Sequence, residues 1–223
     1  LGEFSALVCG GAIDFRDAIK LVQYRGQFMQ QAVPVGVGAM AAIIGLSSDS
    51  VDKVCADLTS EHQGKYSLSA VNYNSPDQTV IAGHTELVDQ AIAPLKAAGA
   101  RKAIILPVSA PFHTELMIPA GEKLKRKIEA TEFRSPQIDV LSNVTAALHH
   151  DPAKIKELLV RQISSPVDWV GCMRFVSKMQ INNIIECGPG SVLKNLCRRI
   201  DRSFVCRSIE KPNDLSSAVG MDF

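Results

Sequence analysis

A regular alternation of short apolar runs and amphipathic stretches between residues 38 and 106 constrains the fold more than any other feature of the chain. Runs rich in apolar residues predict strands, and apolar residues three or four positions apart predict helices. The predicted strands cover 39–44, 67–72, 79–82 and 101–106, and the predicted helices cover 49–58 and 86–98. This strand–helix–strand–strand–helix–strand order within about seventy residues is typical of a ferredoxin-like βαββαβ unit.

The sequence on either side of this unit is organised differently. Before it, helical spacing predicts helices over 1–11 and 15–32. After His113, helices are expected at 116–130, 152–163, 166–179 and 191–200, alternating with strands at 138–141, 183–187 and 204–209. We therefore expect an α/β protein in which residues 1–37 and 107–223 form one discontinuous large subdomain and residues 38–106 a smaller inserted one. The tail after residue 212 is expected to be frayed.

Composition excludes several classes of function. The 223 residues are 46% hydrophobic and 21% charged, with a formal net charge of +1, so neither nucleic acid nor an anionic membrane is an expected partner. The apolar runs are too short to span a bilayer. Six cysteines are scattered without metal-ligand or redox spacing, which predicts reduced thiols in a cytoplasmic protein and no metal site.

A histidine follows the last predicted strand of the βαββαβ unit. The apolar run ends at Pro107, and Pro111 and Phe112 directly precede His113. Proline restricts the backbone, which suits a group that must stay in place as a general base. On spacing alone, a packed or surface histidine is the commoner interpretation.

An arginine interrupts the apolar face of the helix predicted at 15–32. The expected buried stripe contains Arg25, and its apolar members are Ala18, Val22 and Met29, with Phe15, Ile19 and Gly26 beside them. A guanidinium on an apolar face needs a partner, because unpaired burial costs several kcal/mol. That partner is either a core Asp or Glu, or the carboxylate of a ligand held by two parallel hydrogen bonds.

Two glycine- or asparagine-rich turns have both a structural and a functional interpretation. Gly188-Pro189-Gly190 precedes a predicted helix, where it could hold a phosphate, but it lacks the other residues of known phosphate motifs, so a tight turn is favoured. Residues 74–77 are predicted to form a turn, and Asn74 could line a polar pocket edge. A basic cluster after the glycine turn could meet an acidic partner; its members are Lys194, Arg198, Arg199 and Arg202.

Seven motifs together resemble the malonyl-CoA:acyl carrier protein transacylase family of bacterial type II fatty-acid synthesis. In order they read LGEFSALVCGG, QYRGQFMQ, GAMAAIIGL, VNYNSPDQTVIAGH, LPVSAPFHTELM, LVRQISSPVDW and IIECGPGSVL. The resemblance implies a hydrolase-like core with a parallel sheet, interrupted by the ferredoxin-like insertion. In the family a Gly-His-Ser elbow immediately precedes Leu-Gly-Glu. The nucleophilic serine is therefore expected just before Leu1, and the sheet is expected to be incomplete here.

The resemblance also implies a role for each matching residue. His113 would be the base that activates the serine, and the backbone carbonyl of Gln162 would orient it. The backbone N–H of Leu1 would donate to the oxyanion. Arg25 would bind the malonyl carboxylate. Two further substrate contacts are predicted from position: Phe112, which lies beside the base and would crowd the α-carbon of the acyl group, and Asn74, at the polar pocket edge. The candidate site residues are therefore His113, Gln162, Leu1, Arg25, Phe112 and Asn74.

The implied reaction is ping-pong transfer of a malonyl group. Serine attacks malonyl-CoA to form an acyl-enzyme, and the phosphopantetheine thiol of acyl carrier protein then takes the acyl group. No cofactor or metal is implied, and the expected protein is a cytoplasmic monomer. Without the serine, the 223 residues alone are expected to be inactive. The alternatives are a serine hydrolase or thioesterase, which uses water as acceptor, and a non-catalytic acyltransferase-like domain.

Overall fold

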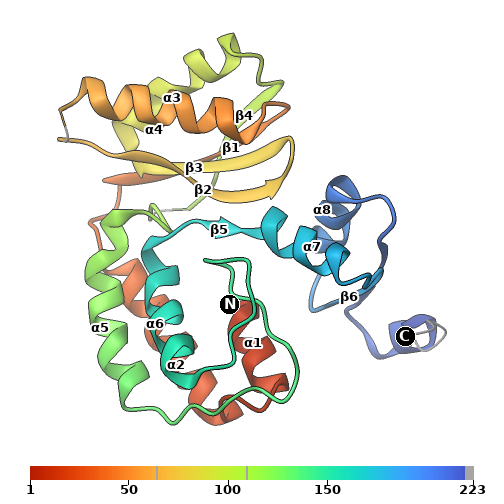
Figure 1. Cartoon of the computed structure of the whole chain (residues 1–223). Helices are drawn as coiled ribbons and strands as arrows, with labels where there is room; N and C mark the ends of the chain where they lie inside the picture. The colour runs from red at the N-terminus through yellow and green to blue at the C-terminus, as the bar shows by residue number, and fades with distance from the viewer. Residues whose placement is uncertain (64, 109, 219–223) are drawn as a thin grey trace.

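The chain folds into a mixed α/β structure, as the sequence predicts. The computed structural model describes residues 1–63, 65–108 and 110–218. Figure 1 shows a sheet with two helices at the top, a layer of helices below it, and a smaller C-terminal lobe to one side. Within the described residues, no helix is both long and apolar enough to cross a membrane.

The upper lobe contains the predicted order of two helices and four strands. Its elements are β1 (Gly38–Ile44), α3 (Ser48–Glu61), β2 (Leu68–Ser75), β3 (Gln78–His84), α4 (Thr85–Ala97) and β4 (Lys102–Ile105). The strand order is β4-β1-β3-β2, and all three neighbouring pairs are antiparallel. A short fifth strand, β5 (Val167–Asp168), pairs in parallel with β2 and ties the C-terminal half of the chain to this sheet.

Both faces of the central part of this sheet are covered, whereas the edge strand β4 leaves Ile104 and Ile105 each 48% exposed. Apolar side chains of α3 and α4 pack on one face around Ile43 and Ile81, both of which are fully buried. On the other face lie Met40, Val71, Val80 and Ala82, and the ring of Phe112 packs against them from outside the sheet. The segment that carries His113 is therefore anchored to the underside of the sheet.

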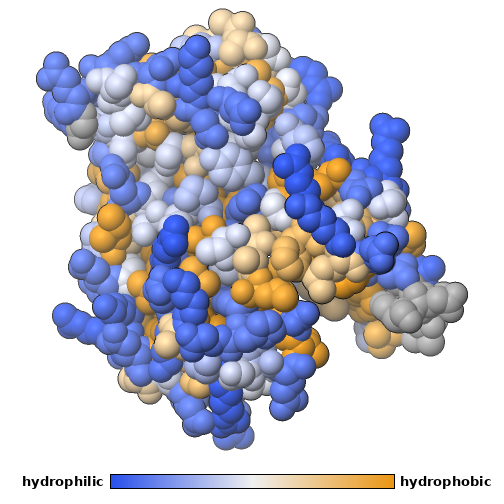
Figure 2. All heavy atoms as spheres, in the orientation of Figure 1, coloured by the Kyte–Doolittle hydropathy of each residue, from blue (hydrophilic) through white to orange (hydrophobic). Residues whose placement is uncertain are grey.

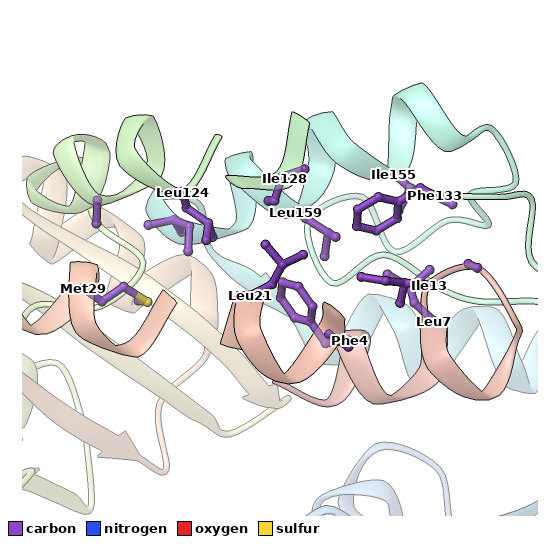
Figure 3. Close-up of a cluster of buried hydrophobic side chains, with 14 of the residues drawn as sticks. Phe4, Leu7, Ile13, Leu21, Met29, Leu124, Ile128, Phe133, Ile155 and Leu159 are labelled. Carbon is purple, nitrogen blue, oxygen red and sulfur yellow. The ribbon is translucent and has the colours of Figure 1, made fainter. Parts of the chain in front are cut away.

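The lower lobe is a layer of helices around its own core. It consists of α1 (Gly2–Cys9), α2 (Phe15–Gln30), the short η1 (Glu115–Met117), α5 (Ile118–Glu129) and α6 (Pro152–Arg161). Figure 3 shows Phe4, Leu7 and Leu21 pointing toward Leu159 and Phe133 across this core. Burying apolar side chains of this size contributes about 1.5–3 kcal/mol each. The core therefore fixes α1 and α2, which carry Leu1 and Arg25, against the helices that flank His113 and Gln162.

The C-terminal lobe contains a second, parallel pair of strands. After η2 (Gln162–Ser164) the chain forms α7 (Trp169–Lys178), β6 (Asn183–Cys187), α8 (Val192–Ile200), β7 (Val205–Ile209), η3 (Pro212–Asp214) and α9 (Leu215–Ala218). β6 and β7 pair only with each other among the described strands. The frayed tail predicted after residue 212 is thus wrong for residues 212–218, and residues 219–223 lie outside the described part of the chain.

Three local predictions are corrected by the structure. The strand expected at 138–141 is absent from this described segment, which forms only a single bridge between Leu141 and Leu148. The helix expected at 166–179 begins at Trp169, because the two residues before it pair with β2. The turn expected at 74–77 is shorter, because Asn74 and the next residue continue β2.

One further prediction, about the buried face of α2, is also partly wrong. Ala18 and Met29 are buried as expected, but Leu21 takes the place predicted for Val22, which is half-buried. Phe15 and Ile19 were expected beside the stripe, yet their side chains are 63% and 51% exposed. The helix therefore has a second apolar face that no described segment covers.

Candidate functional site

His113 lies in the bend between β4 and η1, in an unusual backbone conformation. Its φ of +67° is in the left-handed region, which costs a non-glycine residue of order 1 kcal/mol and is concentrated at functional sites. Its Nδ1 lies 2.8 Å from the backbone carbonyl oxygen of Gln162. Because a carbonyl can only accept, we assign the ring proton to Nδ1, which leaves Nε2 with the lone pair that a general base needs.

The surroundings of His113 keep its imidazole neutral. Burial is the largest cause that lowers the pKa of His113, and the positive charge of Arg25 adds to it. The carbonyls of Gln162 and Ser165 oppose this shift, and the resulting pKa is about 4. At neutral pH the ring is therefore unprotonated and able to accept a proton.

Arg25 is half-buried on α2 and has no carboxylate partner among the described residues. No ion pair within 4.0 Å joins it to another described residue, and its Nε is buried without a hydrogen bond to that part of the chain. Burial lowers the pKa of Arg25, and only the more distant charge of Glu3 opposes this. The alternative of a core Asp or Glu paired directly with Arg25 is therefore not what the structure contains.

Leu1 brings its main-chain nitrogen to the same region. It is the N-cap residue of α1, so its nitrogen lies at the positive end of that helix. The charge of Arg25 lowers the pKa of His113 and that of the Leu1 nitrogen, so the three groups lie in one region, although they come from α1, α2 and the bend after β4.

Gln162 reaches His113 from the end of α6 and also bonds to α1. Its side chain is 2% exposed, and its Nε2 donates to Glu3 Oε2 at 2.6 Å. Glu3 is a residue of this site that the sequence pattern did not predict. The signal available was an acidic residue immediately before Phe4 on the apolar face of a helix, a pattern that calls for a buried partner.

The two predicted substrate-contact residues have different outcomes. Phe112, next to the base, packs against both the lower-lobe core and the underside of the sheet. It also lines a surface hollow of about 500 Å³ with Gln30, Pro107 and Val108. Asn74 lies within β2, and no hydrogen bond within the described chain joins it to His113 or Arg25.

The glycine turn before α8 has the structural role that its sequence favours. Gly188 and Gly190 have φ values of +134° and +84°, which other residues rarely adopt. The carboxylate of Glu186 accepts the N–H groups of Leu193 and Lys194, at 2.9 and 3.0 Å. Because these first-turn donors are already occupied, the turn does not offer an open phosphate site. No cluster that could hold a metal ion occurs among the described residues either.

Comparison with known proteins agrees with this arrangement. Residues 1–211 match the acyl transferase domain family. The malonyl CoA-acyl carrier protein transacylase of Salmonella typhimurium is 45% identical over 219 residues, which are 98% of this chain and 70% of the relative. The acyl-carrier-protein S-malonyltransferase of Burkholderia pseudomallei is 45% identical with a TM-score of 0.94, covering 99% of this chain and 70% of that one.

A third relative was solved together with its carrier protein. It is a malonyl-transacylase in complex with a type II PKS acyl-carrier protein, 42% identical with a TM-score of 0.93, and the match covers 97% of this chain and 69% of that one. Identity at this level along almost the entire chain is far above what a shared fold alone requires. The chain therefore belongs to the malonyl CoA-acyl carrier protein transacylases, a family of acyltransferases.

Proposed function

We propose that the protein transfers a malonyl group from coenzyme A to the phosphopantetheine thiol of acyl carrier protein in fatty-acid synthesis, through a seryl acyl-enzyme. The single observation that supports this most is that a neutral imidazole and a half-buried guanidinium, which has no ion-pair partner among the described residues, lie in one region. The first can remove a proton from a hydroxyl or thiol, and the second can hold the free carboxylate of a malonyl group.

The proposed first step forms the acyl-enzyme. A serine immediately before Leu1 attacks the malonyl thioester carbonyl, and Nε2 of His113 accepts the serine proton. The N–H of Leu1, at the N-terminus of α1, donates to the oxyanion that develops. The carbon–sulfur bond then breaks, and His113 returns the proton to the departing coenzyme A thiolate. Arg25 holds the malonyl carboxylate throughout.

The second step reverses the first with a different thiol. His113 accepts the proton of the phosphopantetheine thiol, whose sulfur attacks the carbonyl of the acyl-enzyme. The ester C–O bond then breaks, and His113 returns the proton to the serine oxygen. Acyl carrier protein is the proposed partner, and the complex formed by the 42% identical relative supports this choice. No metal or cofactor enters the proposed reaction, and a cytoplasmic, monomeric state stays a prediction.

We also propose the subdomain division that the sequence predicts, with residues 38–106 as a ferredoxin-like insertion and residues 1–37 and 107–223 as a hydrolase-like subdomain. The antiparallel order β4-β1-β3-β2 supports the first part. The parallel pair β6–β7 supports the second, because parallel strands normally belong to larger, covered sheets.

The exposed apolar face of α1 and α2 supports a covering segment upstream of Leu1. These helices line a hollow of about 320 Å³ that includes Leu1, Phe15 and Ile19. These three residues are 51–65% exposed. Figure 2 shows hydrophobic surface in the lower half of the molecule, around the position of the N-terminus in Figure 1. Apolar surface of this kind is normally buried against other parts of a protein.

The acyl-enzyme proposal predicts where malonyl can attach. After incubation with malonyl-CoA, the full-length protein is expected to gain one malonyl group, measured as intact mass. The 223 residues alone are expected to gain none, because none of their serines follows a Gly-His pair. Replacing the serine before Leu1 by alanine in the full-length protein is the matched control. A malonyl adduct on the 223-residue chain would contradict the proposed nucleophile.

The ring of Phe112 is expected to exclude a branched acyl group. It is held between two apolar cores directly beside the base, so it cannot easily move away from an added methyl group. In the full-length protein, Phe112→Ser is expected to raise the kcat/KM ratio of methylmalonyl-CoA to malonyl-CoA about tenfold, since one methyl group is worth roughly 10–200-fold. Phe28→Ser, a half-buried phenylalanine of α2, is the control. An unchanged ratio in Phe112→Ser would refute the steric argument.

A further inference from the structure

A buried carboxylate lies behind the group that orients His113. Glu3 is 5% exposed, and its Oε2 accepts two hydrogen bonds, from Gln162 Nε2 at 2.6 Å and from the backbone N–H of Asn143 at 2.9 Å. These contacts join α1, the start of η2 and the loop after α5. The first bond is direct, short and shielded from water, so it is among the stronger hydrogen bonds of the molecule.

The second oxygen of Glu3 faces another buried side chain. Glu3 Oε1 lies 3.6 Å from Nε2 of His149, which is 3% exposed. Neither of these atoms has a hydrogen-bond partner among the described residues, and 3.6 Å is longer than a hydrogen bond. His149 therefore lies beside the carboxylate without bonding to it, and the hydrogen bonds that hold Glu3 are those accepted by Oε2.

The position of Gln162 makes this anchoring consequential. It is the C-cap of α6 and the first residue of η2. Carbonyls at the end of a helix lack the usual partner four residues later, so the helix does not fix their direction. The carbonyl of Gln162 points to His113 Nδ1 instead, while the side chain of the same residue is held by Glu3. The direction of the carbonyl therefore depends on a bond formed on the other side of Gln162.

We infer that Glu3 is a positioning residue for the reaction: by holding the Gln162 side chain, it aims the Gln162 carbonyl and so keeps the His113 proton on Nδ1. This inference deepens the proposed function and rests on it. Glu3 does not touch the substrate or the reacting atoms in this scheme. Its effect reaches the base through two hydrogen bonds and one residue.

The test uses four variants of the full-length protein, which contains the serine upstream of Leu1. Glu3→Ala and Gln162→Ala each remove one end of the 2.6 Å bond, and the double variant removes both. Each single variant is expected to lower kcat for malonyl transfer by about 10–100-fold, the usual effect of losing an orienting hydrogen bond, with KM changed less than about twofold. Glu3→Gln keeps an accepting oxygen and is expected to recover kcat to within about threefold of the wild type.

Two readouts separate positioning from a general loss of structure. The double variant is expected to be no slower than the slower single variant, because both changes break the same bond. The ¹⁵N chemical shifts of the His113 ring are expected to show the Nδ1–H tautomer in the wild type and in Glu3→Gln, and a mixture of tautomers in Glu3→Ala. Thr59→Val is the control for destabilisation, because it removes two half-buried hydrogen bonds to the backbone of Leu68 in the upper lobe, far from His113 in the sequence.

The outcomes are distinguishable from failure of the proposed function. If the wild type transfers malonyl and both alanine variants keep its kcat and tautomer, the inference is overturned while the function stands. Strictly multiplicative losses in the double variant would also overturn it. If the wild type itself transfers no malonyl, the proposed function fails, and the tautomer comparison alone then decides whether Glu3 positions His113.

Discussion

Arg25→Ala in the full-length protein is expected to lower kcat/KM for malonyl transfer about 10³-fold. Two charge-assisted hydrogen bonds to the malonyl carboxylate would be lost, at about 1.5–3 kcal/mol each. Transfer of acetyl, which has no carboxylate, is expected to suffer much less, so the acetyl-to-malonyl ratio should rise by at least about 10²-fold. An unfilled guanidinium in a half-buried site disfavours acetyl in the wild type, and its removal relieves that penalty.

The experiment measures kcat/KM for malonyl-CoA and acetyl-CoA side by side. Arg16→Ala, which removes an exposed arginine from the same helix, is the matched control and should leave both values unchanged. Arg25→Lys keeps the charge but not the two parallel donors, and is expected to fall between the wild type and Arg25→Ala. Unchanged malonyl kinetics in Arg25→Ala would remove this residue from the substrate site.

His113→Ala is expected to lower the rate of acyl-enzyme formation about 10³-fold, within the range usual for loss of a general base. The serine hydroxyl would then have to lose its proton to water at neutral pH. Rapid-quench measurement of the malonyl adduct separates this step from later transfer. His150→Ala, an exposed histidine, is the control. A variant lacking His113 that acylates at the wild-type rate would exclude this residue as the base.

The lowered pKa of His113 also sets the pH dependence of that step. Because burial and Arg25 lower this pKa, and Leu1 carries no charged amine in the full-length protein, kcat/KM is expected to stay nearly flat from pH 8 to below pH 6.5 and to fall only at lower pH. With an ordinary histidine as base, whose pKa is about 6.5, the enzyme would already lose half of its activity at about pH 6.5. A midpoint near 6.5 would therefore contradict the buried, neutral base.

The same shift contributes to stability with a definite sign. Between pH 4 and 6.5 the unfolded chain binds a proton at His113 that the folded chain excludes. The free energy of unfolding contributed by this residue is therefore complete above pH 6.5 and declines as the pH falls through this window. His113→Ala is accordingly expected to flatten the pH dependence of the unfolding midpoint there.

Several elements were predictable because their information is local. The strands of the upper lobe and helices such as α5 and α6 follow from the spacing of apolar residues, and α6 also from Asp151 and Pro152 at its start. The strand predicted at 138–141 was wrong because a strand also depends on contacts that are not local. Its apolar residues suit a strand, but a strand needs a partner, and only one bridge is available there.

The site residues, too, differ in how far local sequence could predict them. The sequence pattern singled out His113 and Arg25, and the resemblance to a family added Gln162, Leu1 and Phe112. Asn74 was selected from a turn that the structure replaces with a continued strand. Spacing left the partner of Arg25 undecided, because a core carboxylate and a ligand carboxylate demand the same pattern of residues around it.

The sequence by itself determined the class of the protein and the order of most of its elements, and it singled out His113 as the candidate base, since these depend on periodicity and on motifs within a few residues. Only the tertiary structure decided that Arg25 has no carboxylate partner in the described chain, and that Glu3 holds Gln162 from 159 residues away. Contacts between distant residues depend on how completed elements pack. A hydrogen bond across that packing leaves no periodic trace in either segment, so it becomes visible only once the chain is folded.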